Sequence, residues 1–318
     1  SVASATHRDK LSSATVEPKR WIGKRKALVF KMAANLTDAA KLGEVKVLNE
    51  GTPSSNKPEP APDIAGKLQK IMLKLKGKFM DADGKKVDYA SLKKSKEFEE
   101  YCEEVKQLQK VSLESLTEIQ RKVFFINIYN ALTIHGLVEH DKLPDSVLKI
   151  QHFFKTTAYN VGGFVFTLDD IEHGILRGNK SHPASIKPQL DSKDPRLKFA
   201  LKSCDPRLHF ALVCGAKGCP AINVYTEENL EKALEAATKT FCQTEVEMRS
   251  QQDQILLSRL FQWYRQDFGE TDTDVIRWVT QYLTRDQQDR ASILLLKLEK
   301  FGPVEVKYKE YDWSINSS

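Results

Sequence analysis

Apolar side chains recur at helical spacing in several segments of this sequence. In residues 67–79 they return every three or four positions with lysines between them, which predicts an amphipathic helix. Residues 112–136 are apolar on nearly every side, so we expect a helix buried at the centre of the fold. Further helices are predicted over residues 168–177, 227–242, 260–268 and 274–283.

Shorter apolar runs predict strands. Residues 159–168 have two glycines at their centre and predict a hairpin. Other strands are expected over residues 208–213, 254–258 and 303–313. The run at 208–213 belongs to the second of two similar segments, DPRLKFALKSC and DPRLHFALVCG, which follow each other from residue 194 to 215. Because strands and helices do not alternate regularly, the pattern favours an α+β fold, a single main domain with mixed short strands and a buried central helix.

Composition divides the chain near residue 63. Residues 51–63 carry four prolines among small and polar residues, which is typical of an extended linker. We therefore expect residues 1–62 to be a disordered basic head and linker, and residues 63–316 to form the folded domain. Met32 is followed by small residues in an ordinary initiation context, so residues 1–31 are interpreted as an extension upstream of the native start.

The charge distribution argues against nucleic acid as a partner. The formal net charge is +6, but residues 1–31 hold 8 basic and 2 acidic side chains, which leaves 41 of each in the rest of the chain. A neutral body offers no attraction to polyanions, so we expect any macromolecular partner to be a protein. No apolar run reaches the roughly 18 residues of a membrane span.

Cysteine usage bears on location. The five cysteines are spread over the chain, and no secretory signal precedes them, which indicates a reducing compartment and makes the cytoplasm the expected location. The alternative is secretion into an extracellular matrix, if the natural N-terminus lies further upstream.

Cys219 is the strongest candidate for a reactive group. It follows a glycine-containing turn at residues 215–218, whose backbone N–H groups can stabilise a thiolate. A nearby imidazole would make the thiol a nucleophile, and the expected base is His209 or His173, with Asn127, Asn130 or Asp205 orienting the ring. This combination predicts a thiol-dependent hydrolase or acyl transferase.

Four other side chains are candidates for substrate contacts. Arg177 and Arg207 would either bind an anionic group or pair with buried carboxylates. Trp263 and Asp267 are four residues apart on one predicted helix, so both would line the same wall of a cleft.

Two alternative interpretations stay open. His209, Cys214 and Cys219 form an H-x4-C-x4-C pattern that would suit a zinc-binding module. A fourth ligand would come from Glu172, His173 or His182. In a regular strand, however, His209 and Cys214 would face opposite sides, so we expect no metal and no cofactor. The other alternative is a non-catalytic binding or scaffold domain, whose buried polar side chains satisfy backbone groups.

Four motifs of the chain resemble a known family, the domain of unknown function 547. They are FFINIYNALTIHGLV, YNVGGFVFTLDDIEHGILR, DPRLHFALVCGAKGCPAI and LFQWYRQDF, which run from about residue 123 to 268. The resemblance implies a soluble protein of a family with no assigned activity. The family motifs coincide with Asn127, Asn130, Glu172, His173, Arg177, Asp205, Arg207, His209, Cys214, Cys219, Trp263 and Asp267. The chain is also distantly similar to papain-like and transglutaminase-like folds, in which the buried helix carries a cysteine where Asn127 stands here.

Overall fold

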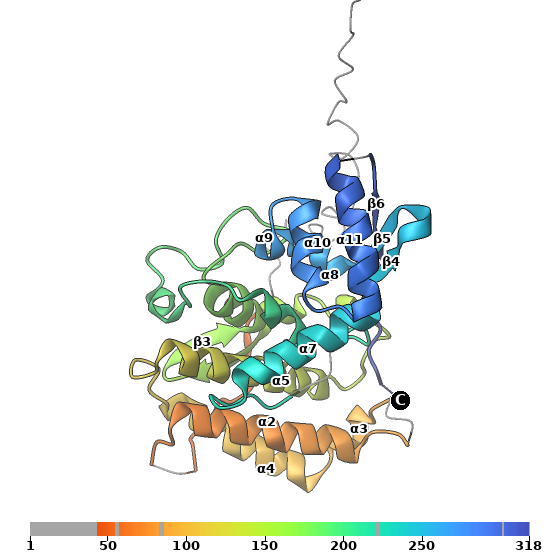
Figure 1. The fold of residues 1–318 in the computed structure, drawn as a ribbon. Coiled ribbons are helices and arrows are strands. Elements are labelled where there is room, and N and C mark those ends of the chain that lie inside the picture. Colours follow the sequence, from red (N-terminus) through yellow and green to blue (C-terminus); the bar gives the residue numbers. More distant parts are fainter. Residues whose placement is uncertain (1–42, 55–56, 83–85, 220–222, 301, 318) are drawn as a thin grey trace, which may run out of the picture. The chain divides into compact units, whose positions relative to one another are not determined.

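The structure of this chain is a computed structural model, which describes residues 43–54, 57–82, 86–219, 223–300 and 302–317. The predicted basic head up to residue 42, including Met32, lies outside the described residues. The described part combines helices and strands, which confirms the predicted α+β class (Figure 1). None of its helices is long and apolar enough to cross a membrane. The expected likeness to papain-like and transglutaminase-like folds stays a prediction.

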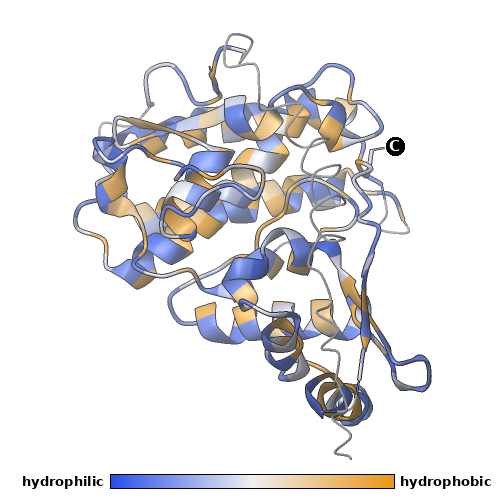
Figure 2. Ribbon diagram, turned by 90° about the horizontal axis from the view of Figure 1, so that it is seen from above, coloured by the Kyte–Doolittle hydropathy of each residue, from blue (hydrophilic) through white to orange (hydrophobic). Residues whose placement is uncertain are grey.

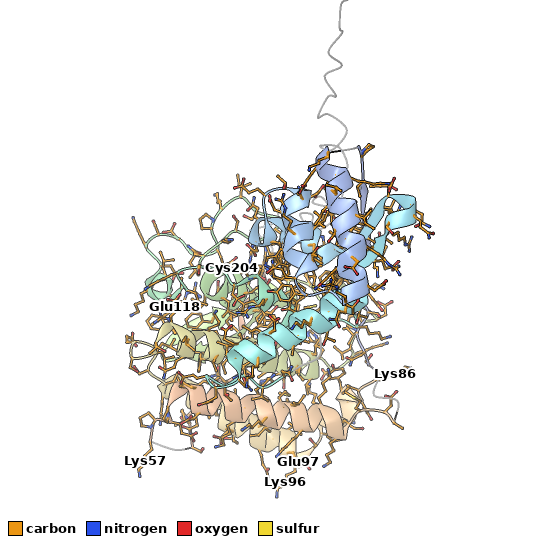
Figure 3. The ribbon with its side chains drawn as sticks, in the orientation of Figure 1. Lys57, Lys86, Lys96, Glu97, Glu118 and Cys204 are labelled. Atoms are coloured by element: carbon orange, nitrogen blue, oxygen red, sulfur yellow. The ribbon has the colours of Figure 1, made fainter. Side chains whose placement is uncertain are left out.

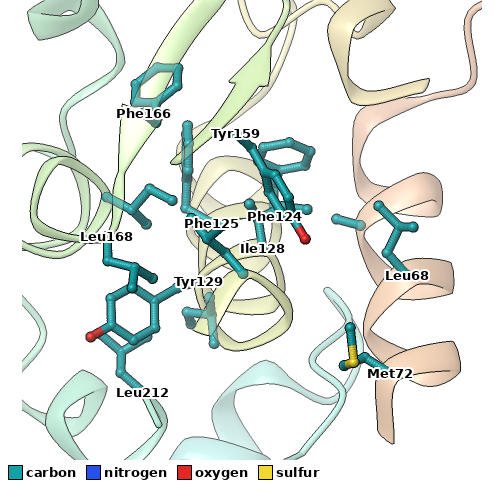
Figure 4. Close-up of a cluster of buried hydrophobic side chains, with 14 of the residues drawn as sticks. Leu68, Met72, Phe124, Phe125, Ile128, Tyr129, Tyr159, Phe166, Leu168 and Leu212 are labelled. Atoms are coloured by element: carbon teal, nitrogen blue, oxygen red, sulfur yellow. The ribbon is translucent and has the colours of Figure 1, made fainter. Parts of the chain in front are cut away.

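The central helix predicted from the apolar run is α5, Glu118–Val138. A capping box closes its first turn, because the side chains of Thr117 and Gln120 each accept a hydrogen bond from the other's backbone N–H. Every residue from Val123 to Val138 is buried, so the helix lies inside the protein. The amphipathic helix α2, Ala61–Lys78, packs against it through its apolar side (Figure 4).

The first of the two described sheets has the strand order β1-β2-β3, with bounds Lys46–Val47, Thr157–Val161 and Phe164–Thr167. β1 runs parallel to β2, and β2 pairs with β3 in antiparallel fashion. This pair confirms the predicted hairpin. Its turn places Gly162 and Gly163 at φ values of +59° and +86°, in the left-handed region that glycine adopts most easily.

The second sheet has the order β4-β5-β6, with bounds Glu247–Arg249, Gln254–Ser258 and Glu305–Lys309. β4 and β5 are antiparallel, and β6 returns parallel to β5. The predicted strands over 254–258 and within 303–313 are therefore confirmed.

Two clusters of buried apolar side chains stabilise the fold. One surrounds α5 and includes α2 and the first sheet, and the other lies between the second sheet and the C-terminal helices. The outer helices carry an apolar and a polar side (Figure 2). The remaining α-helices are α3 (Tyr89–Lys93), α4 (Lys96–Glu104), α6 (Phe153–Thr156), α7 (Leu230–Glu245), α8 (Arg259–Trp263), α9 (Arg265–Phe268), α10 (Asp272–Thr280) and α11 (Arg285–Lys300).

The strand predicted over residues 208–213 is wrong. Residues Pro206–Phe210 form the 3₁₀ helix η6 instead. The carboxylate of Asp205 accepts hydrogen bonds from the backbone N–H of Arg207, at 3.1 Å, and from its guanidinium, at 2.8 and 3.0 Å. Proline suits the first helical position, since it has no N–H to leave unpaired there. The hydrogen bonds of the Asp205 cap thus stabilise a 3₁₀ helix where the apolar run predicted a strand.

The two similar segments fold alike. In the first copy, Pro195–Phe199 forms the 3₁₀ helix η5. The Asp194 carboxylate accepts hydrogen bonds from the backbone N–H and the guanidinium of Arg196, as Asp205 does from Arg207. The copies differ at the position where Lys198 matches His209: the lysine reaches Glu114 at the surface, whereas the histidine is buried.

The side chains of Asn127 and Asn130, on the central helix α5, bond the backbone of the loop that follows η6, at residues 211, 213 and 225. Asn130 donates to the Ala211 carbonyl and accepts from the Val213 N–H, at 3.0 and 2.8 Å. Asn127 makes the same pair of bonds with the backbone of Tyr225, at 2.8 and 3.0 Å. All four backbone groups are thus satisfied by side chains rather than by a neighbouring strand, as the scaffold interpretation expects for buried asparagines.

The described fold begins upstream of the boundary predicted at residue 63. β1 pairs with β2, and next to it the fully buried Asn49 accepts from the Asn160 N–H and donates to the Asn160 carbonyl, at 2.8 Å each. Residues 46–49 are therefore part of the folded body. The helix predicted over 260–268 is also interrupted, because α8 ends at Trp263 and α9 begins at Arg265.

We expect Asn127→Ala to lower the free energy of unfolding by about 2–4 kcal/mol, because it leaves a buried backbone N–H and carbonyl without partners. Urea denaturation with an unchanged m-value would measure the loss. The exposed Lys232→Ala on α7 is the control and should stay within about 0.5 kcal/mol of the parent. Equal stability of the two variants would show that Asn127 does not hold the loop.

Candidate functional site

A π-helix carries several of the candidate residues. This helix, η4, spans Asp170–Leu176, and Arg177 follows it directly. Its start is fixed by Thr167 and Asp170, whose side chains bond each other's backbone N–H groups, and by Arg196, which donates to the Asp170 carboxylate at 2.7 Å. Helices of this wide type are rare and occur often at functional sites.

The carboxylate of Asp267 is the common acceptor of three surrounding side chains. It accepts from His209 Nε2 at 2.8 Å, from Arg177 Nε at 2.7 Å and from Lys180 Nζ at 2.7 Å. Its side chain has no solvent-exposed surface. Burial opposes the charged form, but the hydrogen bonds from His209 and Arg177 outweigh it and hold the pKa of Asp267 well below its usual range.

A second buried carboxylate, Glu172, lies on the π-helix. It accepts from the hydroxyl of Tyr264 at 2.6 Å and from that of Tyr129 at 2.9 Å. Burial opposes its ionisation, but the bond from Tyr264 and the charge of Arg177 favour it, and the pKa of Glu172 lies below its usual value. The Tyr264 ring also stacks on His209, with centroids 3.9 Å apart, and therefore joins the two carboxylates.

One ring nitrogen of His173 is hydrogen-bonded to Arg177. Its Nδ1 accepts from Arg177 Nη1 at 2.9 Å, and the same guanidinium nitrogen donates to the Ser181 carbonyl. Burial lowers the pKa of His173 to about 3, so the ring is neutral at pH 7. The ring of His182 meets it edge to face, with centroids 4.9 Å apart.

Two groups in the described part of the chain have the spacing of metal ligands. One is Asp169, His173 and His182, and the other is Cys204, His209 and Asp267; within each group the ligand atoms lie within 4.8 Å of one another. Cys204 stands directly before the second similar segment (Figure 3). Burial and the Asp267 charge raise its pKa to about 12, so this thiol stays protonated.

Cys219 lies in a different group, next to Cys214. The two Sγ atoms are 2.7 Å apart, and the Cys214 N–H donates to Cys219 Sγ at 3.1 Å. The hydroxyl of Tyr311 donates to Cys219 Sγ at 3.5 Å and lies 3.6 Å from Cys214 Sγ. Burial opposes a thiolate at Cys219, but these hydrogen bonds outweigh it and lower its pKa, while the pKa of Cys214 is raised by its bond to Cys219 and by burial.

The turn between the two cysteines needs a glycine and a partner segment. Gly215 has φ +85°, and a Cβ there would come within 2.8 Å of the Leu137 side chain. The C-terminal segment 311–315 pairs with the turn: Lys217 N–H donates to the Ser314 carbonyl and Gly218 N–H to the Asp312 carbonyl, at 2.8 and 3.0 Å. The geometry of the thiols therefore depends on residues almost a hundred positions away.

The structure thus divides the residues predicted from the sequence. His173, His209, Arg177 and Asp267 are brought together, whereas the described contacts of Cys219 include no imidazole. The triplet proposed for zinc is separated, because residues 206–210 are helical and turn His209 toward Asp267.

Three other candidates have mainly structural contacts. Both polar atoms of Asn127 bond the backbone of Tyr225, and Arg207 pairs with Asp205 and Glu231. Trp263 packs against the rings of Tyr311 and Trp313, which places it beside the cysteine turn rather than beside Asp267. Sequence reasoning missed Tyr129, Lys180, Cys204 and Tyr311 as members of these groups. The aromatic residues and Cys204 carry no pattern that separates them from core residues, and Lys180 resembles an ordinary surface lysine.

Comparison with known proteins gives one finding. Residues 113–242 match the model of the family described as "Protein of unknown function, DUF547". No curated protein and no solved structure matches the chain significantly. The matched span contains the π-helix, both similar segments and the cysteine turn, while Tyr264, Asp267 and Tyr311 lie beyond it.

We expect Asp267→Asn to destabilise the protein by about 3–5 kcal/mol, because it leaves the buried Arg177 without its countercharge. The matched control is Glu235→Gln, which breaks an exposed pair with Lys239 and should cost at most about 1 kcal/mol. Denaturant unfolding of the three proteins measures both values. A cost for Asp267→Asn no larger than that of the control would contradict the role of this carboxylate as the common acceptor.

Proposed function

We propose that this chain, whose residues 113–242 belong to the DUF547 family, is a thiol–disulfide exchange protein in which Cys219 attacks and Cys214 resolves. The observation that carries this proposal is the 2.7 Å separation of the two sulfur atoms at a partly exposed turn. Formation of a disulfide at about 2.05 Å needs only a small movement of the two side chains.

The reaction we propose uses a disulfide R–S–S–R of a small thiol, such as glutathione, as the oxidant. The Cys219 thiolate attacks one sulfur, so a Cys219–S–S–R bond forms and the R–S–S–R bond breaks, releasing RS⁻. Cys214 then loses its proton to the released thiolate and attacks Cys219 Sγ, which gives the Cys214–Cys219 disulfide and a second RS⁻. Two electrons pass from the two protein thiols to R–S–S–R, and excess RSH reverses the sequence.

The surroundings of the sulfurs favour this division of roles. Cys219 receives hydrogen bonds from the Cys214 N–H and from Tyr311, which stabilise negative charge on its sulfur. Lys76 of α2 also lies within electrostatic range of Cys219. Cys214, in contrast, has a raised pKa and stays a thiol until the mixed disulfide has formed.

A hydrolytic or acyl-transfer role for Cys219 has less support. Such chemistry needs a base that takes the thiol proton and later activates water or an acceptor. The described partners of Cys219 are Cys214 and Tyr311, while His209 and His173 bond Asp267 and Arg177. A non-catalytic domain that binds another protein is the remaining alternative, and an unreactive Cys219 would favour it.

The cytoplasm suits the proposed exchange. The described structure contains five unpaired cysteines, and a reducing compartment would keep Cys214 and Cys219 in the dithiol form from which the reaction starts.

Cys219 should be the most reactive thiol of the reduced protein. At pH 7 we expect iodoacetamide to modify it on the order of 100-fold faster than Cys102, since the larger thiolate fraction outweighs the lower nucleophilicity. Burial and Glu139 raise the pKa of Cys102 to about 12. Because the pKa of Cys219 is lowered, its rate should level off below the pH of about 8.5 at which an ordinary thiol titrates.

Peptide mass spectrometry after timed labelling measures both rates, with Cys219→Ser as the control that lacks the fast site. Equal rates for Cys219 and Cys102 would remove the basis of the proposed function.

The proposed division of roles is tested by trapping the mixed disulfide. With excess glutathione disulfide, Cys214→Ser should accumulate one glutathione adduct at Cys219, because it keeps the backbone N–H that bonds Cys219 but lacks the resolving thiol. The parent protein should instead form the internal disulfide, and Cys219→Ser should gain no adduct at Cys214. Intact-mass measurement distinguishes the three products, and a stable adduct on the parent would contradict resolution by Cys214.

A further inference from the structure

We propose that Asp169, His173 and His182 bind a divalent transition-metal ion of the zinc type, with a coordination position left open. This inference is independent of the proposed thiol exchange, since none of its residues contacts Cys214 or Cys219 among the described hydrogen bonds.

The three ligands come from two adjoining segments. Asp169 directly precedes the π-helix and His173 lies four residues further on, while His182 comes from the loop that follows. This loop is closed at its base by Asn179, whose side chain donates to the Leu190 carbonyl and accepts from the Leu190 N–H. Asp169 and His173 are only 6% and 1% exposed, whereas the partly exposed His182 provides a route from solvent.

The distance between two of these ligands points to a missing ion. His173 Nε2 and Asp169 Oδ1 are 4.0 Å apart, which is too long for a hydrogen bond. Ligand atoms about 2.0–2.2 Å from the same ion can lie up to about 4 Å apart. In the described part of the chain the ion-pair contact of the Asp169 carboxylate is this long one to His173, so little offsets the cost of burying its charge.

The second contacts of the imidazoles fix which nitrogen faces the ion. His173 Nδ1 bonds Arg177 and His182 Nδ1 accepts from the Ala184 N–H, so both Nε2 atoms are the ones left for Asp169. In the metal-free protein each Nε2 therefore carries the ring proton. On binding, the His173 ring proton moves to Nδ1, so the bond from Arg177 Nη1 to this nitrogen breaks and Nη1 keeps its bond to the Ser181 carbonyl. Glu172 Oε1, 3.8 Å from Nδ1, lies on the side from which an acceptor can approach, and His182 exchanges its bond with the Ala184 N–H for one to water.

The donor set selects the class of ion. Two imidazoles and one carboxylate suit zinc and related transition metals, whereas calcium and magnesium prefer oxygen ligands. Three protein ligands leave room for a water molecule or a substrate. The neighbouring group of Cys204, His209 and Asp267 is a poorer site, because hydrogen bonds from Arg177, Lys180 and His209 already occupy the Asp267 oxygens.

The test is a titration of the chelator-treated full chain with Zn²⁺, in a Cys214→Ser, Cys219→Ser background so that the thiol pair cannot bind the ion. We expect one Zn²⁺ per chain by calorimetry, and an increase in the thermal midpoint that saturates with it. Asp169→Asn and His182→Ala should each weaken binding by at least about 100-fold, since even outer contacts contribute roughly 10- to 100-fold. Co²⁺ at the same site should give visible absorption bands typical of imidazole ligation.

His140→Ala is the control, because this histidine lies on another segment and packs against Phe153. It should bind Zn²⁺ like the background protein. Circular dichroism of the metal-free variants separates loss of a ligand from loss of the fold. The proposal is overturned if no saturable site appears, or if the folded Asp169→Asn and His182→Ala variants bind Zn²⁺ as tightly as the control.

Discussion

The buried carboxylate of Asp267 is the interaction on which the polar region of this protein depends. It joins two regions that lie 58 to 90 positions before it in the sequence: the end of the π-helix and the loop that follows, through Arg177 and Lys180, and the 3₁₀ helix η6, through His209. A shielded carboxylate is tolerated only where cations and N–H groups surround it, so each segment must adopt the position that satisfies it. The glutamate on the π-helix depends on the same arrangement, because Tyr264 bonds it while stacking on His209.

Hydropathy alone was enough to predict the elements whose partners are apolar. α5, the β2–β3 hairpin, α7 and β5 follow their patterns because burial of apolar side chains decides them. Residues 208–213 have an equally apolar pattern but no strand, since Asp205 and Asn130 take up backbone groups that a ladder would need. A pattern of apolar residues does not record such competition between side chain and backbone.

The candidate sites were predictable only in part, for a related reason. The types of residue were visible, but the prediction that paired them assumed a strand, and the observed turn instead brings Cys214 beside Cys219. Asp267, the partner of His209, lies 58 positions away, and Tyr311, which bonds Cys219, lies 92 positions away, separations at which no local spacing rule applies. The interruption between α8 and α9 also matters: it lets the adjacent Trp263 and Tyr264 contact different groups, the aromatic residues beside the thiols and the carboxylate of Glu172.

The pairing of residues 311–315 with the cysteine turn has a consequence for the order in which the protein assembles. A ribosome makes the turn at residues 214–219 long before it makes the segment that holds it. The backbone bonds of Lys217 and Gly218, and the hydroxyl of Tyr311, become available only after that segment has emerged. Until then Cys219 lacks the bond from Tyr311, and the turn lacks the backbone bonds that fix its geometry.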